Sequence, residues 1–331
     1  MTAEEFIAEW HSPSPLMLVH TSGSTGKPKP LWVEKRRMVA SARATCSFLG
    51  LKQGDTALLC MSLDYIAGKM MAVRAEVCGM QLIEVQPSAH PLATLDKAPA
   101  FAAMVPMQVF ETLKVERERE LLRQTRHLII GGGAVDEALA EELRTFPNAV
   151  WSTYGMTETL SHIAMRRMNG PTASDWYEPM EGVETDINEE GCLVVHAPAV
   201  CACDIVTNDR ATMAEDGRSF RIIGRKDNVI CSGGIKIQAE EVEQKLKAHI
   251  ENPFAITKVA DRKFGEAVTM LIEGSPDMER ICAICKQELP HYWLPRHYFA
   301  VEQLPMTDTG KPARQQMEKI AQALLDETRN V

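Results

Sequence analysis

A run of small, hydroxyl-bearing and basic residues near the start of the chain could bind an anion. Residues 20–30 read HTSGSTGKPKP. Glycines let a backbone turn tightly and bring its N–H groups close to an anion, and hydroxyl and ammonium groups add further donors. Pro28 prevents helical continuation after the lysine, so this is not a Walker A loop. A flexible Ser/Gly linker is the alternative. The candidate phosphate-binding residues are Thr21, Ser22, Gly23, Ser24, Thr25, Gly26 and Lys27.

Two further glycine-containing stretches follow predicted strands. Residues 131–134 read GGGA, and the three glycines would leave room for a flat ring beside the backbone; a plain strand-to-helix turn is the alternative. Residues 154–159 read YGMTET. A carboxylate beside phosphates is repelled unless a divalent cation lies between them, so Glu158 is a candidate Mg²⁺ ligand. The alternative for Glu158 is a solvated loop acid.

Charged residues in the second half of the chain complete the set of candidates. Asp209 lies in the stretch TNDR, Arg225 and Asp227 lie at the expected domain junction, and Lys311 follows a glycine in TDTGKPAR. Taken singly, Asp209 could be a turn former and Lys311 a surface lysine. Their order along the chain, after the glycine-containing stretches, favours functional roles for these residues.

Composition limits the possible partners. The 331 residues are 45% hydrophobic and 24% charged, as in an ordinary globular protein. The net charge of −9 and a pI near 5.6 argue against nucleic acid and anionic membranes. The acidic N-terminal residues and the lack of a long apolar run predict a cytoplasmic protein. We expect the nine cysteines to be reduced thiols, and Cys282 and Cys285 to be core residues rather than zinc ligands.

The hydrophobic pattern predicts two domains. Strands are expected at 15–20, 56–61, 82–85, 101–105 and 127–130, with helices at 65–78 and 135–145, which indicates an α/β layered domain. Shorter strands follow at 192–197 and 220–224. A second unit is expected to contain a helix at 239–249, two strands around Gly265, and a last helix near 276–289. The domain boundary is placed near 225–227, giving domains of 1–225 and 226–331.

These stretches, in this order, resemble the adenylate-forming superfamily of acyl- and aryl-CoA ligases, peptide-synthetase adenylation domains and luciferases. The resemblance runs from His20 to Arg314. It implies a large layered α/β N-terminal domain, in a truncated form of the adenylate-forming fold, and a small mobile α+β C-terminal domain. Pro30 stands where the family usually has glycine. The phosphate loop also begins about twenty residues from Met1, whereas family members carry a longer preceding segment, so a homodimer covering an exposed face is a hypothesis.

The resemblance also implies a two-step reaction with ATP, Mg²⁺ and coenzyme A. A carboxylate attacks the α-phosphorus of ATP and displaces pyrophosphate; a thiol then attacks the acyl carbon and displaces AMP. Lys311 and Thr157 would stabilise the reacting groups, Glu158 would hold Mg²⁺, and Asp227 would be the hinge. The residues implied to contact the nucleotide or CoA, besides the phosphate loop, are Gly131, Gly132, Gly133, Tyr154, Gly155, Met156, Asp209, Arg225, Gly233, Gly234 and Lys236.

The acid substrate is suggested by a finer resemblance. YGMTETLSHIAMR and MSLDYIAGKMMAVRAEVCG are similar to the o-succinylbenzoate-CoA ligases of menaquinone biosynthesis, with Tyr65 in a position usually held by histidine and Arg74 in a basic position. Lys69 and His162 are further candidates for binding the acid. Lys69 and Arg74 are separated by about 140° around a helix, so we do not expect both in one pocket. Another small aryl- or acyl-CoA ligase and a degenerate nucleotide-binding scaffold are the alternatives.

Overall fold

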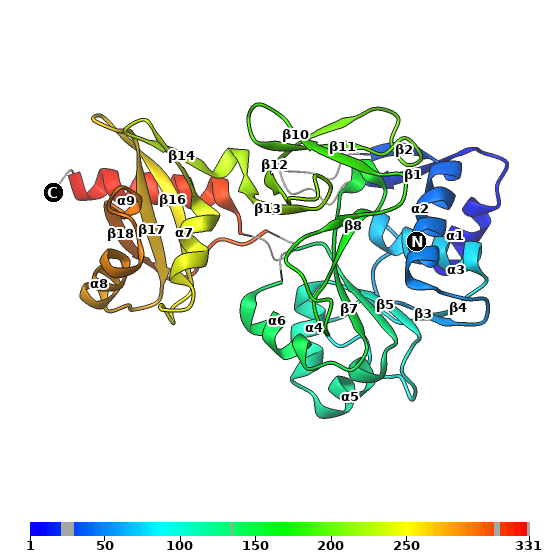
Figure 1. Ribbon diagram of the computed structural model, residues 1–331. Helices are drawn as coiled ribbons and strands as arrows, with labels where there is room; N and C mark the ends of the chain where they lie inside the picture. The colour runs from blue at the N-terminus through cyan, green and yellow to red at the C-terminus, as the bar shows by residue number, and fades with distance from the viewer. Residues whose placement is uncertain (21–29, 134, 308–311, 330–331) are drawn as a thin grey trace. The chain divides into compact units, whose positions relative to one another are not determined.

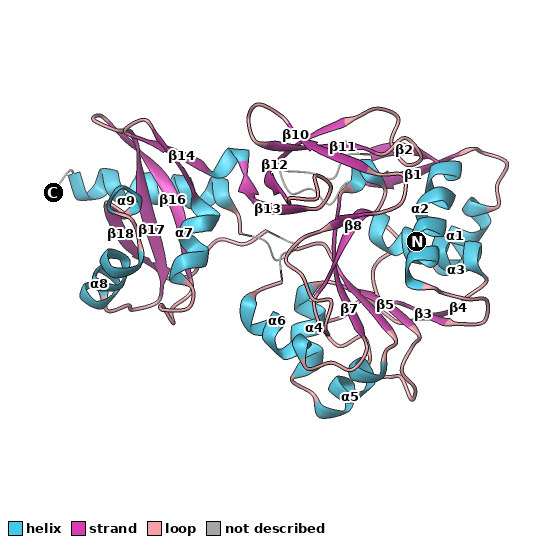
Figure 2. Ribbon diagram, in the orientation of Figure 1, coloured by secondary structure: helices cyan, strands magenta, loops and turns pink. Residues whose placement is uncertain are grey.

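The computed structural model describes residues 1–20, 30–133, 135–307 and 312–329 (Figures 1 and 2). The chain divides into two compact units. Unit 1 comprises Met1–Asp186, Val194–Ile205 and Met213–Arg221, and unit 2 comprises Ile187–Leu193, Val206–Thr212 and Ile222–Val331. The predicted division into domains 1–225 and 226–331 remains a prediction.

Unit 1 is built on a seven-stranded sheet with the order β4-β3-β5-β6-β7-β8-β9. The first five strands in this order run parallel, and β8 and β9 are antiparallel to their neighbours. Parallel strands covered on both faces are expected to be almost continuously apolar, as FAAM and HLII are. The strands are β3 (Thr56–Leu59), β4 (Gln81–Glu84), β5 (Phe101–Met104), β6 (His127–Ile130), β7 (Ala149–Gly155), β8 (His162–Arg167) and β9 (Glu178–Pro179).

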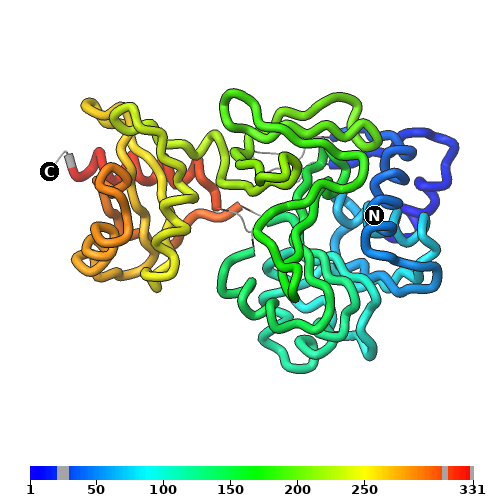
Figure 3. The backbone as a smooth tube through the Cα atoms, in the orientation of Figure 1, coloured from blue at the N-terminus to red at the C-terminus, as the bar shows by residue number. Residues whose placement is uncertain are grey.

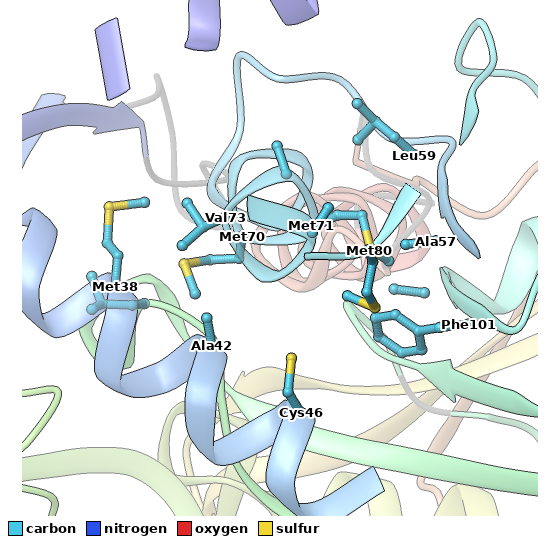
Figure 4. Packing of buried hydrophobic residues seen from close by; sticks show 14 of the residues in the cluster. Met38, Ala42, Cys46, Ala57, Leu59, Met70, Met71, Val73, Met80 and Phe101 are labelled. Carbon is cyan, nitrogen blue, oxygen red and sulfur yellow. The ribbon is translucent and has the colours of Figure 1, made fainter. Parts of the chain in front are cut away.

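Helices cover both faces of this sheet, and alternate strand residues define the two faces. Ala57 and Phe101 pack with α1 (Ala3–Trp10), α2 (Lys35–Leu49) and α3 (Ile66–Cys78). Leu58 and Ala102 pack with α4 (Pro106–Leu113), α5 (Glu116–Gln124) and α6 (Glu137–Arg144). Figure 4 shows the first of these cores, in which side chains of α2 and α3 meet those of β3 and β5. The periodicity of two along each strand therefore separates the two cores.

Two smaller sheets accompany the large one. Strands β1 (Leu16–His20) and β2 (Pro30–Glu34) form an antiparallel pair in which His20 lies opposite Pro30. Strands β10 (Glu184–Ile187), β11 (Cys192–His196), β12 (Ile205–Met213) and β13 (Phe220–Arg225) form a four-stranded sheet in chain order, whose residues are divided between the two units. The path of the chain through these strands can be followed in Figure 3.

Unit 2 also has a sheet with helices on both faces. Its order is β15-β14-β17-β16, with β18 paired to β17. On one face the sheet packs against α7 (Ala239–Leu246) and α8 (Met278–Glu288), and on the other against α9 (Arg314–Arg329). The strands are β14 (Val229–Ser232), β15 (Ile235–Gln238), β16 (Phe254–Asp261), β17 (Gly265–Glu273) and β18 (His297–Val301). The predicted fold class, a layered α/β region followed by a small α+β region, is confirmed.

Two sequence predictions are wrong. The helix near 276–289 is not the last one, because α9 follows it and buries Met317, Ala321 and Leu325, a stripe with helical spacing that the prediction overlooked. The expectation that all cysteines are free thiols is also wrong, since Cys46 of α2 and Cys78 of α3 form a disulfide. These two helices pack side by side, which brings the sulfurs together. Among the described helices, none is long and apolar enough to cross a membrane.

Candidate active site

The predicted nucleotide motifs of unit 1 lie at the carboxyl ends of neighbouring parallel strands. Gly131, Gly132 and Gly133 follow β6, and the turn after β7 contains Thr157 and Glu158. In open α/β sheets, ligands bind outside the carboxyl ends of the strands. A Cβ on Gly131 would lie 2.5 Å from Thr153 Oγ1 on β7, so a larger residue here would force the Thr153 side chain to move. The structure therefore brings these two motifs together.

The turn between β7 and β8 is tightly folded. A Cβ on Gly155 would lie 2.3 Å from the Ser161 carbonyl oxygen, so the lack of a side chain allows the backbone to return alongside itself. Thr159 Oγ1 accepts a hydrogen bond from the Met156 N–H and lies 2.6 Å from the Ser161 carbonyl oxygen. Leu160 has a φ of 65°, which is unusual for a residue with a branched side chain. Such strained positions cluster at functional sites.

The side chains of this turn differ in exposure. Thr157 is buried, whereas the Glu158 carboxylate is exposed at the short helix Thr157–Thr159. Among the described residues, no cluster of three or more metal-ligating side chains is present. One exposed carboxylate still fits Mg²⁺, because this ion is commonly held by one or two carboxylates together with phosphates of the substrate. Glu158 therefore remains a candidate ligand.

An aromatic cluster supports Tyr154, which precedes this turn. Its ring centroid lies 5.9 Å from that of Tyr177 and 5.2 Å from that of Phe220. Tyr177 and Ser152 share a hydrogen bond of 2.8 Å between their hydroxyl groups. Edge-to-face packing of this kind fixes the plane of a ring. Met156 follows one residue after Gly155 and is partly buried.

The acid-binding candidates lie in separate surroundings. Tyr65 caps the start of α3 and is 44% exposed. Lys69 is buried against α1: its Nζ lies 3.4 Å from Met1 Sδ and 3.9 Å from Glu9 Oε2. Arg74 is buried on α3 near β8, where it donates to Ser161 Oγ. Lys69 and Arg74 thus have different neighbours, as the helical angle between them predicts.

Arg74 lies in a buried polar cluster with His162. The His162 Nε2 atom is 2.9 Å from Thr45 Oγ1, and its Nδ1 atom is 3.4 Å from Ser161 Oγ. Burial, with a contribution from the Arg74 charge, lowers the pKa of His162 well below its usual value, so the imidazole is neutral. Burial lowers the pKa of Arg74 to about 10. Neither Thr45 nor Ser161 was predicted from the sequence; Ser161 lies two residues after the YGMTET motif, whereas nothing in the sequence marks Thr45.

Unit 2 contains the remaining described candidates. Arg225 Nη1 donates to Asp209 Oδ1 at 3.2 Å, and the Asp209 N–H donates to Thr207 Oγ1 at 3.1 Å. Asp227 is exposed in the short helix after β13. Gly233 and Gly234 form the turn between β14 and β15, with exposed Lys236 on β15. The structure therefore brings Asp209 and Arg225 together.

Eight candidates lie outside the described residues. They are Lys311 and the phosphate loop Thr21, Ser22, Gly23, Ser24, Thr25, Gly26 and Lys27. The neighbours of Lys311 in the sequence are described: Met306 pairs with Pro312, and Arg314 begins α9. Arg314 makes a two-bonded ion pair with Glu243 of α7, with N–O distances of 2.6 and 2.7 Å.

Comparisons with known proteins agree with the fold. A solved structure of an acyl-CoA synthetase (AMP-forming)/AMP-acid ligase II-like protein from Dyadobacter fermentans is 35% identical, with a TM-score of 0.66, over 95% of this chain and 93% of that chain. O-succinylbenzoate coenzyme A synthetase from Bacillus subtilis, solved with ATP and a magnesium ion, has the same fold, with a TM-score of 0.74 and 22% identity over 90% of this chain and 69% of that one.

Sequence comparison gives the same family. A 2-succinylbenzoate–CoA ligase of Bacillus mycoides is 25% identical over 97% of this chain and 74% of the relative. The family model described as AMP-binding enzyme matches residues 3–199, more than half of the chain. The family resemblance drawn from the motifs is confirmed. The chain belongs to the family of AMP-binding enzymes.

Proposed function

We propose that this chain is an AMP-forming acid–CoA ligase whose acid is o-succinylbenzoate, as in menaquinone biosynthesis. The carboxylate would attack the α-phosphorus of ATP and displace pyrophosphate, and the thiol of coenzyme A would then attack the acyl carbon and displace AMP. The family and the names of the curated relatives support a ligase. The choice of acid rests on Arg74.

Arg74 is a buried cation with no counter-ion among the described residues. Its side chain is 2% exposed, and among the described residues its guanidinium donates to Ser161 Oγ and has no carboxylate within ion-pair distance. Its buried Nε also has no partner there. A buried charge without a partner is costly, so such groups mark sites where a ligand completes the pairing. A dicarboxylic aromatic acid would supply the missing carboxylate, and a guanidinium can bind it through two hydrogen bonds.

A hydrogen bond links Arg74 to the turn that carries the nucleotide motif. Ser161, its hydrogen-bond partner, follows Glu158 by only three residues in the turn between β7 and β8. One carboxylate of o-succinylbenzoate would react beside Thr157 and Glu158, while the other would reach Arg74. Exposed Tyr65, at the start of α3, would pack against the aromatic ring. Lys69 is engaged with α1 and is not needed for this arrangement.

The remaining roles concern the nucleotide. We assign the phosphate loop, the glycines after β6 and the start of the YGMTET turn to binding ATP. Asp209, oriented by the Arg225 guanidinium, would accept hydrogen bonds from the ribose hydroxyls. Glu158 would hold Mg²⁺, which neutralises phosphate charge when bound. Lys311 would stabilise negative charge on the α-phosphate and the attacking carboxylate.

The second half-reaction involves the small domain. We assign residues 1–225 to binding the nucleotide and the acid, and residues 226–331 to a mobile domain that carries Lys311. Asp227 would serve as the hinge, and Gly233, Gly234 and Lys236 would line the coenzyme A step. Hinges of this kind change the backbone angles of very few residues. A homodimer is part of the same hypothesis.

Pyrophosphate exchange with ATP tests the choice of acid. The purified protein would be assayed with o-succinylbenzoate and with benzoate, which has no second carboxylate, and Arg74→Ala would be assayed beside it. We expect exchange with o-succinylbenzoate, and a KM for this acid at least tenfold higher in Arg74→Ala with little change in the KM for ATP. Equal use of benzoate, or an unchanged KM in the variant, would favour another aryl- or acyl-CoA ligase. No exchange with any acid would favour a degenerate scaffold.

A further inference from the structure

A chain of hydrogen bonds connects Arg74 to the backbone of α2. It runs from the guanidinium through Ser161 and His162 to Thr45 and ends at the Ser41 carbonyl oxygen. All five residues belong to unit 1: Ser41 and Thr45 lie on α2, Arg74 lies on α3, Ser161 ends the turn before β8, and His162 is the first residue of β8. Ser41, Thr45, Arg74 and His162 are buried. Water therefore cannot readily substitute for a lost partner within this chain.

The direction of each hydrogen bond follows from donor counting. Thr45 Oγ1 lies 3.1 Å from the Ser41 carbonyl oxygen and must donate its single proton there. It can then only accept from His162 Nε2, so the proton of the neutral imidazole lies on Nε2. Nδ1 is left as an acceptor for the Ser161 hydroxyl, 3.4 Å away. The oxygen of Ser161 keeps its lone pairs for the Arg74 N–H.

We propose that His162 and Thr45 are positioning residues that orient Ser161, and through it the Arg74 guanidinium, for the second carboxylate of the acid. His162 thereby acts as a neutral link and does not bind the substrate itself. This inference rests on the proposed function of Arg74. A side chain held in place before binding loses less conformational freedom when the ligand arrives. The series of hydrogen bonds should therefore lower the KM for the acid.

Two substitutions break the chain at different links. Thr45→Val keeps the shape of the side chain but removes the acceptor for Nε2–H, and His162→Leu removes both imidazole nitrogens. His162→Asn should rescue the function in part, because its amide oxygen lies near the position of Nδ1 and can accept from Ser161. We expect Thr45→Val and His162→Leu to raise the KM for o-succinylbenzoate about three- to tenfold, with the KM for ATP unchanged.

A matched control is available in the same unit. Thr112 of α4 is as buried as Thr45, but its hydroxyl has no hydrogen-bond partner among the described residues. Thr112→Val should therefore leave both KM values unchanged. If Thr45→Val behaves like Thr112→Val, or if the KM for ATP rises by the same factor as that for the acid, the positioning role is refuted.

A measurement without substrate separates this inference from the proposed function. In ¹⁵N NMR spectra of histidine-labelled protein at neutral pH, His162 should be neutral with its proton on Nε2, and Thr45→Val should change this signal while Thr112→Val does not. A proton on Nδ1 would refute the proposed series of hydrogen bonds, whichever acid the enzyme uses. If Arg74→Ala leaves the KM for o-succinylbenzoate unchanged, the proposed acid is wrong. The NMR result then tests the series of hydrogen bonds independently of the acid.

Discussion

Arg74 in unit 1 and Arg314 in unit 2 are both largely shielded from water, but the charges around them differ. The Arg314 guanidinium binds both carboxylate oxygens of Glu243 and also donates to the Ile256 carbonyl oxygen. Burial alone would lower the pKa of Arg314, but the hydrogen bonds and charge of Glu243 outweigh it and raise the pKa. The pKa of Arg74 is lowered by burial to about 10, and no carboxylate in the described part of the chain offsets this effect.

This difference separates a structural arginine from one available to a ligand. Glu243 also accepts a hydrogen bond from the Ile256 N–H at 2.7 Å, so the pair joins α7, β16 and the start of α9. Arg74 forms no ion pair with a carboxylate among the residues that the structure describes. Breaking a satisfied pair should cost stability, whereas removing an unpaired charge should cost affinity.

The largest effect is expected at Lys311, three residues before Arg314. Lys311→Ala should slow adenylate formation by about 10²- to 10³-fold, from the loss of one donor that stabilises transition-state charge. Thioester formation from pre-made acyl-adenylate should largely survive. Single-turnover assays of the two half-reactions would measure this. Equal losses in both would mean that Lys311, like Arg314, is structural.

Arg314→Ala should instead reduce stability. Removing one member of a buried ion pair costs about 3 to 5 kcal/mol, and because the Arg314 side chain is 23% exposed we expect about 2 kcal/mol. Denaturant unfolding followed by circular dichroism would measure the free energy of unfolding. A variant as stable as the wild type would show that the Glu243 pair contributes nothing.

Arg74→Met should show the reverse behaviour. The free energy of unfolding should stay the same or rise by up to about 1 kcal/mol, because an uncompensated buried charge is replaced by an apolar side chain of similar length. The KM for o-succinylbenzoate should rise at least tenfold, or about 1.4 kcal/mol. Steady-state kinetics and denaturant unfolding of the same preparation would measure both quantities.

Lys69→Met is the matched control for Arg74→Met. Both residues are buried cations on α3, but Lys69 has Glu9 nearby and faces α1. Its KM for the acid should change less than about twofold, since a distant substitution leaves the site intact. If Lys69→Met raised the KM as much as Arg74→Met, the second carboxylate would be bound elsewhere.

The pH dependence of stability should also report on the surroundings of Arg74. The pKa of His162 is lowered in the folded protein, so below about pH 6.5 the unfolded chain binds a proton that the folded one excludes. Stability should therefore fall with falling pH, by at most about 1.4 kcal/mol per pH unit from this group. His162→Asn should show a shallower fall between about pH 6.5 and 5. Identical slopes in both proteins would mean that His162 is protonated in the folded state.

Sequence reasoning located the elements whose signals are local. Strands such as HLII are continuous apolar runs, and the structure has β6 there as predicted. The long helix α9 was missed because its polar residues mask a narrow stripe of Met317, Ala321 and Leu325, and its partner strands lie far away in the chain. The disulfide depends on the packing of α2 against α3, which no spacing of the two cysteines encodes.

The candidate site shows the same limit. Motif order gave the family, and the helical angle separated Lys69 from Arg74. The links of Arg74 to Ser161 and of Thr45 to His162 could not be foreseen, because they join residues 87 and 117 positions apart in the sequence, which the packing of α2 and α3 near the start of β8 brings together. Donor counting at buried groups needs their neighbours, which only the structure supplies.

The tight turn between β7 and β8 limits how the substrate range of this enzyme can evolve. Glu158, assigned to the nucleotide, and Ser161, assigned to the acid side, lie on one turn whose backbone is fixed by the contact of Gly155 with Ser161. Substitutions in this turn would therefore disturb both substrates at once. Helix α3 carries Arg74 on a separate element. Evolution toward a different acid is then expected to proceed through replacements on α3, which leave the use of ATP intact.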